Sequence, residues 1–162
     1  MRFSYFLDNE KAVSKFGYRK DGQPWPIPPR VKHVGPYGDA GVDLFIPIDL
    51  IVPSFSYEVV DTFVGFIFDI GVAGLVVPRG GDRFLVGSGL VDTGYTGTIH
   101  VRIVNPYDEP IAFKRGDSIG QLVPFVKAHP DGIELHSVPV PSTSVSQRGK
   151  TGRIVAEAAG NV

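Results

Sequence analysis

Short apolar runs separated by turn residues fill the middle of the chain, between residues 41 and 126. The runs are rich in Val, Ile and Phe, and Gly, Pro and Asp residues lie between them. Runs this short are typical of strands, and the repeated turn signals between them indicate an all-β sandwich or barrel. The predicted strands are residues 42–46, 57–60, 64–70, 75–77, 84–86, 97–104, 111–113 and 119–126.

The two ends of the chain are more polar than its middle. Residues 1–38 contain a strand candidate at 2–7 and then a cluster of prolines, which predicts an extended covering segment because proline disrupts helix interiors and central strands. Toward the other end, the pattern predicts a last strand at 133–140, followed by a basic stretch rich in Ser, Thr and Gly. We therefore expect one domain over residues 1–140, with little helix, and a flexible C-terminal arm over residues 141–162.

Composition and charge restrict the classes of fold and partner. The 162 residues include 20 Gly and 14 Pro, which argues against a helical bundle because both residues destabilise helix interiors. The formal net charge is −1, so neither nucleic acid nor an anionic membrane is an expected partner, and any polyanion must be bound by local charges. The chain has no Cys and no apolar stretch typical of a signal peptide or a membrane span. We expect a cytoplasmic protein without disulfides or thiolate metal sites.

Asp92 and Tyr95 are candidate residues for nucleotide chemistry. They follow Gly87-Ser88-Gly89, which lies between two apolar runs and predicts a hairpin tip whose backbone can face the flat edge of a base. Tyr95 can place its ring against a sugar, and a carboxylate such as Asp92 can orient and deprotonate an attacking water. The alternative is that Asp92 merely caps a turn.

Two Gly-rich basic segments are candidate phosphate sites. Arg79 precedes Gly80 and Gly81, and such a segment lets phosphate approach the backbone while the guanidinium binds its oxygens. The second segment is Arg148-Gly149-Lys150, and the alternative for each is an ordinary solvated turn. The four His residues lack metal-ligand spacing, so no zinc site is expected.

Two further polar residues, Asp43 and Gln121, lie within or beside predicted strands. An Asp at such a boundary is usually structural. Gln121 is flanked by apolar residues and needs hydrogen-bond partners if it is buried.

Five segments carry these candidates in order along the chain. They are Ala40-Gly41-Val42-Asp43-Leu44, Val77-Pro78-Arg79-Gly80-Gly81, Gly89-Leu90-Val91-Asp92-Thr93-Gly94-Tyr95-Thr96-Gly97, Gly116-Asp117-Ser118-Ile119-Gly120-Gln121-Leu122 and Gln147-Arg148-Gly149-Lys150-Thr151-Gly152. Together they resemble the motifs of the homotrimeric dUTPase family, most strongly in the first, third and fourth segments. The resemblance implies a jelly-roll or β-clip barrel, a homotrimer with sites at subunit interfaces, and hydrolysis of dUTP to dUMP and pyrophosphate, which limits uracil in DNA.

The resemblance also implies a role for each candidate residue. Asp92 would activate the water that attacks the α-phosphorus, and Tyr95 would pack under the deoxyribose. Backbone groups around Val86, Gly89 and Leu90 would read uracil. The phosphates would be held by Arg79, Gly80, Gly81 and Gln121, with Asp43 in the same catalytic group, and Arg148, Gly149 and Lys150 would close over a neighbouring subunit's site. Mg²⁺ would arrive bound to the triphosphate, so no protein side chain is expected to be its main ligand.

The chain departs from the family pattern at three points. Gly80 replaces a Ser, the interval of 13 residues from Arg79 to Asp92 is short, and Arg153 stands where an aromatic residue is expected. These departures leave open a pyrophosphatase for another or a modified deoxynucleotide, or a nucleotide- or protein-binding regulator with weak turnover. The related dCTP deaminase family is less favoured, because Arg102 stands where its catalytic Glu would fall.

Overall fold

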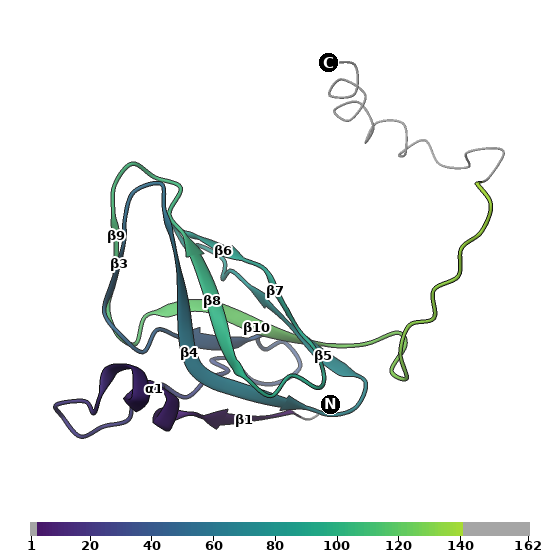
Figure 1. The fold of residues 1–162 in the computed structure, drawn as a ribbon, viewed down its shortest axis with the longest axis horizontal. Helices are drawn as coiled ribbons and strands as arrows, with labels where there is room; N and C mark the ends of the chain where they lie inside the picture. The colour runs from purple at the N-terminus through teal and green to yellow at the C-terminus, as the bar shows by residue number, and fades with distance from the viewer. Residues whose placement is uncertain (1–2, 141–162) are drawn as a thin grey trace, which may run out of the picture. The chain divides into compact units, whose positions relative to one another are not determined.

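The computed structural model describes residues 3–140, and in this part of the chain ten strands and one short helix are present (Figure 1). The expectation of an all-β fold with little helix is therefore confirmed. The elements are β1 (Phe3–Leu7), α1 (Asn9–Phe16), β2 (Val42–Phe45), β3 (Leu50–Val52), β4 (Tyr57–Phe68), β5 (Val72–Val77), β6 (Leu85–Gly87), β7 (Gly89–Val91), β8 (Thr98–Val104), β9 (Ile111–Phe113) and β10 (Ser118–Val126).

The strands form two four-stranded sheets and one small ribbon. One sheet has the order β1-β4-β8-β6, the other has the order β2-β10-β5-β7, and β3 pairs with β9. All of these pairings are antiparallel. One core joins the two sheets, since Phe66 and Val101 of the first pack in the same buried cluster as Leu44 and Leu122 of the second. These strands thus form a sandwich of two antiparallel sheets.

An irregularity in β4 positions a buried carboxylate. The pairing of β4 with β8 shifts register between Asp61 and Gly65, and Phe63 has a φ of 55°, which is uncommon for a residue other than glycine. The backbone N–H of Phe63 donates a 2.8 Å hydrogen bond to Asp61 Oδ1. The bulge therefore holds the Asp61 side chain on the side of the sheet where α1 packs.

The prediction that residues 1–38 form an extended covering segment is wrong at Asn9–Phe16, which form the helix α1. Asp8 caps this helix by accepting a 3.0 Å hydrogen bond from the backbone N–H of Lys11, and Gly17 ends it with a φ of 77°. The prolines that argued against a helix begin only at Pro24, after the helix has ended. Phe16 then packs edge-to-face on Phe63, which attaches the helix to β4.

The chain divides into a compact unit that ends at Asp131 and a second unit that begins at Gly132. The strand predicted at 133–140 is wrong, because residues 132–140 contain no strand and their Ile133, Leu135, Val138 and Val140 side chains are exposed. An alternation of apolar and polar residues makes a strand only where a partner strand supplies hydrogen bonds. The domain boundary at residue 140 stays a prediction.

No helix within residues 3–140 is long and apolar enough to cross a membrane.

Candidate functional site

A polar cavity of about 170 Å³ brings together residues from the first, second and fourth segments. Asp43 of β2, Gln121 of β10 and Arg79, just after β5, all line it, as does Gly80. The sheet register explains this convergence, because Gln121 pairs with Asp43 on one side and with Val77 on the other. Asp43, Gln121 and Val77 therefore form one row across the sheet, and Arg79 follows two residues after Val77. We call this cavity the basic cavity.

Asp43 holds Arg79 in place at this cavity. Arg79 Nε lies 3.2 Å from Asp43 Oδ1, and the Asp43 side chain is only 11% exposed whereas that of Arg79 is 36% exposed. Within residues 3–140, neither terminal guanidinium nitrogen of Arg79 donates a hydrogen bond to a side-chain or backbone acceptor. A planar guanidinium held in this way can present both terminal nitrogens to phosphate oxygens.

Gln121 supports the turn that carries Arg79. Its Nε2 donates a 3.1 Å hydrogen bond to the backbone carbonyl of Pro78, which directly precedes Arg79. The side chain fits because residue 41 is glycine: a Cβ at Gly41 would lie 2.5 Å from Gln121 Oε1. The Gly of the first segment and the Gln of the fourth are therefore linked by packing.

The loop after Arg79 is open on its ligand side. Gly81 has a φ of 85°, which favours glycine, whereas a Cβ at Gly80 would have nothing within 4 Å. Nearby Asp82 has one buried oxygen, Oδ2, that has no hydrogen-bond partner within the described part of the chain. Burial raises the pKa of the Asp82 carboxyl, although the backbone N–H and the charge of Arg79 oppose that rise.

The third segment lines a different cavity of about 240 Å³, which we call the apolar cavity. Its walls are Val76 of β5, residues 89–91 of β7, Tyr95, and residues 98–100 at the start of β8. Because β7 is the edge strand of its sheet, one side of its backbone has no neighbouring strand there. A planar ligand with donors and acceptors on its rim can therefore hydrogen-bond along this edge.

Tyr95 lines the apolar cavity and is held in place by a hydrogen bond. Its hydroxyl donates a 2.9 Å hydrogen bond to the backbone carbonyl of Thr98, while the residue stays 43% exposed. A Cβ at Gly97 would lie 2.5 Å from the Tyr95 hydroxyl oxygen, so a glycine is required for this placement. The ring thus offers a fixed flat surface to a ligand.

Asp92 follows β7 and is exposed. Its backbone carbonyl accepts a 3.1 Å hydrogen bond from the N–H of Tyr95, so the two residues share one turn. Within residues 3–140, its carboxylate has no hydrogen-bond or ion-pair partner. The carboxylate is therefore available to a water or a ligand.

A network of charged side chains lies behind Tyr95. The Lys11 Nζ of α1 lies 2.8 Å from Asp61 Oδ2 and donates a 2.8 Å hydrogen bond to Thr98 Oγ1, and His100 Nε2 lies 3.3 Å from Asp61 Oδ2. Burial opposes ionisation of Asp61, but hydrogen bonds from Lys11, Phe63 and Thr98 together with the charge of His100 outweigh it and lower the pKa. The network anchors Thr98, which in turn holds Tyr95.

The two cavities lie apart within one chain and share no lining residue. Val91 pairs with Gly74 of β5, whereas Gln121 pairs with Val77. Three residues of extended strand span about 10 Å, and Asp92 and Arg79 lie beyond this span in opposite directions. One chain therefore presents the water-activating candidate and the phosphate-binding candidate as separate halves of a site.

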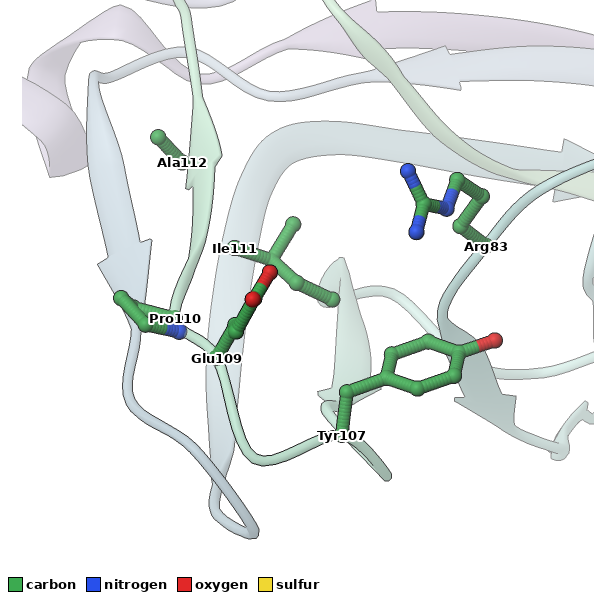
Figure 2. Close-up of a pocket in the computed structure, with 6 residues that line it drawn as sticks. All are labelled: Arg83, Tyr107, Glu109, Pro110, Ile111 and Ala112. Atoms are coloured by element: carbon green, nitrogen blue, oxygen red, sulfur yellow. The ribbon is translucent and has the colours of Figure 1, made fainter.

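A third cavity, of about 230 Å³, lies outside both groups of candidate residues. Figure 2 shows Arg83 and Tyr107 across the hollow from Glu109 and Ile111, and the Arg83 guanidinium carbon lies 5.9 Å from the centroid of the Tyr107 ring. No residue of the five segments lines this cavity.

The expected hairpin at Gly87-Ser88-Gly89 is wrong. β6 pairs with β8 in one sheet and β7 pairs with β5 in the other, so these glycines mark a crossing between sheets. Val86 is 8% exposed in the core and lines neither the basic nor the apolar cavity, whereas Gly89 and Leu90 line the apolar one. Arg148, Gly149 and Lys150 lie outside the described residues.

Residues 25–153 match the model of the dUTPase family. The chain belongs to the dUTPase family. A deoxyuridine 5'-triphosphate nucleotidohydrolase of Mycobacterium sp. (strain JLS) is 35% identical over 135 residues, covering 78% of this chain and 84% of that protein. Another, from Eremothecium gossypii, is 34% identical over 117 residues, covering 70% and 74%.

Solved dUTPase structures share the fold. A structure of the Staphylococcus bacteriophage 80alpha dUTPase with dUPNHPP has a TM-score of 0.68 at 21% identity, covering 91% of this chain and 93% of that one. A mutant dUTPase from phage phi11 of S. aureus, described with a structural Mg(II) ion, has a TM-score of 0.65 at 20% identity, covering 85% and 97%. The expected dUTPase-like jelly-roll fold is thus confirmed.

The dUTPase motifs did not reveal every residue that lines the two cavities. Lys32, His33 and Asp39 line the basic cavity, and Thr98 and His100 line the apolar one. Lys32 and His33 fall in the proline-rich stretch before the first motif, where only a local concentration of basic residues marks them. His100 follows the third motif in a strand whose alternation predicts that it faces outward.

Proposed function

We propose that this dUTPase-family protein hydrolyses dUTP to dUMP and pyrophosphate and so limits uracil in DNA. The observation that carries the proposal is the division of the motif residues into two cavities of different chemistry within this family fold. One cavity is mostly apolar and is lined by a tyrosine, and the other is lined by an arginine that contacts Asp43 and by a glycine of the loop that follows. A nucleoside and a phosphate chain need these two environments.

The apolar cavity suits deoxyuridine. The free edge of β7 at Gly89 and Leu90 can hydrogen-bond the rim of uracil, and Tyr95 can pack under the sugar. Because Gly97 and Thr98 hold the ring in one position, a 2′-hydroxyl on that face of the sugar would meet the ring. Selection of a deoxyribose follows from this restriction.

The basic cavity suits the phosphate chain. Arg79 would bind phosphate oxygens through its terminal nitrogens, Gly80 and Gly81 would admit the chain close to the backbone, and Gln121 would hold the loop. Asp43 acts through Arg79, because it is buried against that guanidinium. Positioning and electrostatic stabilisation of this kind supply most of the acceleration in phosphoryl chemistry.

Magnesium belongs with the substrate in this proposal. Within residues 3–140, no three His, Asp or Glu side chains come together in a way that could hold a metal ion. We therefore treat the substrate as the magnesium complex of dUTP, in which the ion is held mainly by phosphate oxygens and neutralises part of their charge.

Asp92 would act as the general base. It accepts a proton from a water as that water attacks the α-phosphorus, the bond from this phosphorus to the bridging oxygen breaks, and pyrophosphate leaves. The exposed, unpartnered carboxylate fits this role, since a base committed to an ion pair would accept a proton less readily.

Each complete site would need more than one chain, because Asp92 and Arg79 lie in separate halves. The family resemblance favours three chains, in which head-to-tail contacts close a ring and place the Asp92 half of one subunit against the Arg79 half of the next. We propose a homotrimer on these grounds.

Pyrophosphate release in the presence of Mg²⁺ tests the proposal. Wild type should turn over dUTP in preference to dCTP, dTTP, dATP, dGTP and UTP, and Asp92→Asn should lower kcat by about 10²–10⁴-fold, the usual contribution of a general base. If wild type releases pyrophosphate from none of these nucleotides, the proposed enzymatic activity is excluded. Preference for another deoxynucleotide would instead show a related pyrophosphatase.

A further inference from the structure

Two cationic and two carboxylate side chains line the basic cavity, and they differ in how they are paired. Arg79 contacts Asp43, and His33 Nδ1 lies 3.1 Å from Asp39 Oδ1. Lys32 also lines the cavity, and within residues 3–140 its ammonium pairs with no carboxylate. Its ammonium is therefore not held in an ion pair and can turn toward a ligand in the cavity.

Lys32 belongs to a loop whose two ends are joined. The backbone N–H of Asp43 donates to the carbonyl of Arg30 at 2.8 Å, and the N–H of Arg30 donates to the carbonyl of Asp43 at 3.2 Å. This bridge connects the loop to β2, the strand that supplies Asp43 to the cavity. Lys32 is thus only two residues from a fixed point of the sheet.

A second set of contacts clamps the loop on the other side of Lys32. The N–H of His33 donates to Asp39 Oδ2 at 2.8 Å, and the N–H of Asp39 donates to the carbonyl of His33 at 2.8 Å. A Cβ at Gly38 would lie 2.4 Å from the His33 carbonyl oxygen, so this closure requires glycine. Hydrogen bonds from the backbone and ring of His33 lower the pKa of the Asp39 carboxyl and keep it ionised.

We propose that Lys32 is a substrate-binding residue that contacts the phosphate chain of dUTP, and that the His33–Asp39 clamp positions it. The identity of the nucleotide rests on the proposed function, whereas the phosphate contact does not. Gly80 lines the same cavity as Lys32, and a Cβ at Gly80 would have no atom within 4 Å, so the backbone there leaves room for a phosphate group. A lysine suits this task because its three N–H donors on a flexible stem can follow different phosphate oxygens.

Kinetics with dUTP give the first test. Lys32→Ala should raise KM for dUTP by about tenfold, the usual worth of one charged hydrogen bond, and should change kcat by less than about twofold. Lys32→Arg, which keeps the charge, should recover most of the loss. Lys20→Ala, which removes an equal charge from an exposed position away from the described cavities, is the matched control and should behave as wild type. Equal KM values for wild type and Lys32→Ala would overturn the assignment.

Binding of inorganic tripolyphosphate, measured by calorimetry, separates this inference from the proposed activity. Wild type and Lys20→Ala should bind it, and Lys32→Ala should bind it about tenfold more weakly. If wild type binds tripolyphosphate through Lys32 but hydrolyses no dUTP, the proposed function fails and the phosphate contact stands. Absence of binding by wild type, or equal binding by wild type and Lys32→Ala, would overturn the contact itself.

A double-mutant cycle tests the clamp. Asp39→Asn should raise KM for dUTP through displacement of Lys32, and Lys32→Ala should then have a smaller effect in that background than in wild type. Thermal unfolding of each variant reports whether the fold is intact. Strictly additive effects of the two substitutions would show that Asp39 does not position Lys32.

Discussion

Mixing two inactive variants is the most direct test of a site shared between chains. Asp92→Asn keeps Arg79 but lacks the proposed base, and Arg79→Ala keeps Asp92 but lacks the phosphate contact. In a ring of chains, a site is complete when its Arg79 half comes from the first variant and its Asp92 half comes from the second. With equal amounts and random assembly, half of the sites receive an intact Arg79 half and half receive an intact Asp92 half. About one quarter of the sites should therefore be complete.

The strand register is the reason to expect that mixing restores activity. Asp92 and Arg79 lie beyond opposite ends of a stretch of β5 that spans about 10 Å. Arg79 lines the basic cavity, whereas Asp92 follows Val91, which lines the apolar cavity. If both residues served one site within a single chain, every site of the mixture would lack one of them, and mixing would restore nothing.

The assay is pyrophosphate release from dUTP after the two variants have been co-expressed, or unfolded together and refolded. The control is the same two proteins combined in the folded state, which should show only the sum of their residual activities before chains exchange. Release near one quarter of the wild-type rate supports the shared site. A refolded mixture no more active than the control would refute the argument from the sheet register.

Two further predictions concern Tyr95 and its supporting network. Gly97→Ala should displace the Tyr95 ring with little loss of stability, because the Cβ meets only the tip of that side chain; KM for dUTP should rise about tenfold, within the range for loss of ring stacking. If KM for dUTP, measured by pyrophosphate release, does not rise in Gly97→Ala, Tyr95 does not pack on the substrate. Asp61→Asn should lower the free energy of unfolding at pH 7 by about 1–3 kcal/mol. The pKa of Asp61 is lower in the folded protein than in the unfolded chain, where it is about 4. The stability that ionised Asp61 contributes is therefore present above the unfolded pKa and is lost as pH falls through the folded pKa. In acid-unfolding curves, the difference in stability between wild type and Asp61→Asn should shrink over this range.

The strand pattern predicted most of the fold because it depends on local signals. The apolar runs of β8 and β10 are bounded by turn residues, as expected. The core contains Ile99, Val101 and Ile103 of β8 and Ile119 and Leu122 of β10. The helix α1 was missed although Asp8 and Gly17 are ordinary capping residues, because the prolines further along dominated the interpretation of that segment. At residues 133–140 the opposite error occurred, since an alternating pattern does not supply a partner strand.

The hairpin error has a different cause. Gly87-Ser88-Gly89 separates two short apolar runs, and local sequence does not distinguish a turn within one sheet from a crossing between two sheets. That distinction depends on which distant strand offers free hydrogen-bonding groups, here β8 for β6 and β5 for β7. Val86 accordingly lies in the core rather than beside a base.

Motif residues and strand patterns are properties of short segments, so the order of amino acids was enough to identify the class of fold, the family and the residue types that carry the proposed chemistry. The folded sheets decided which of these residues meet, because strand register brings together residues far apart in the chain. The register places Asp43 and Gln121 beside Val77, two residues before Arg79, and separates them from Asp92 and Tyr95. The structure also brought Lys32 to the basic cavity, through a loop closed by contacts between its own two ends. No pattern of apolar and polar residues encodes such a closure, since it depends on where β2 lies in the folded sheet.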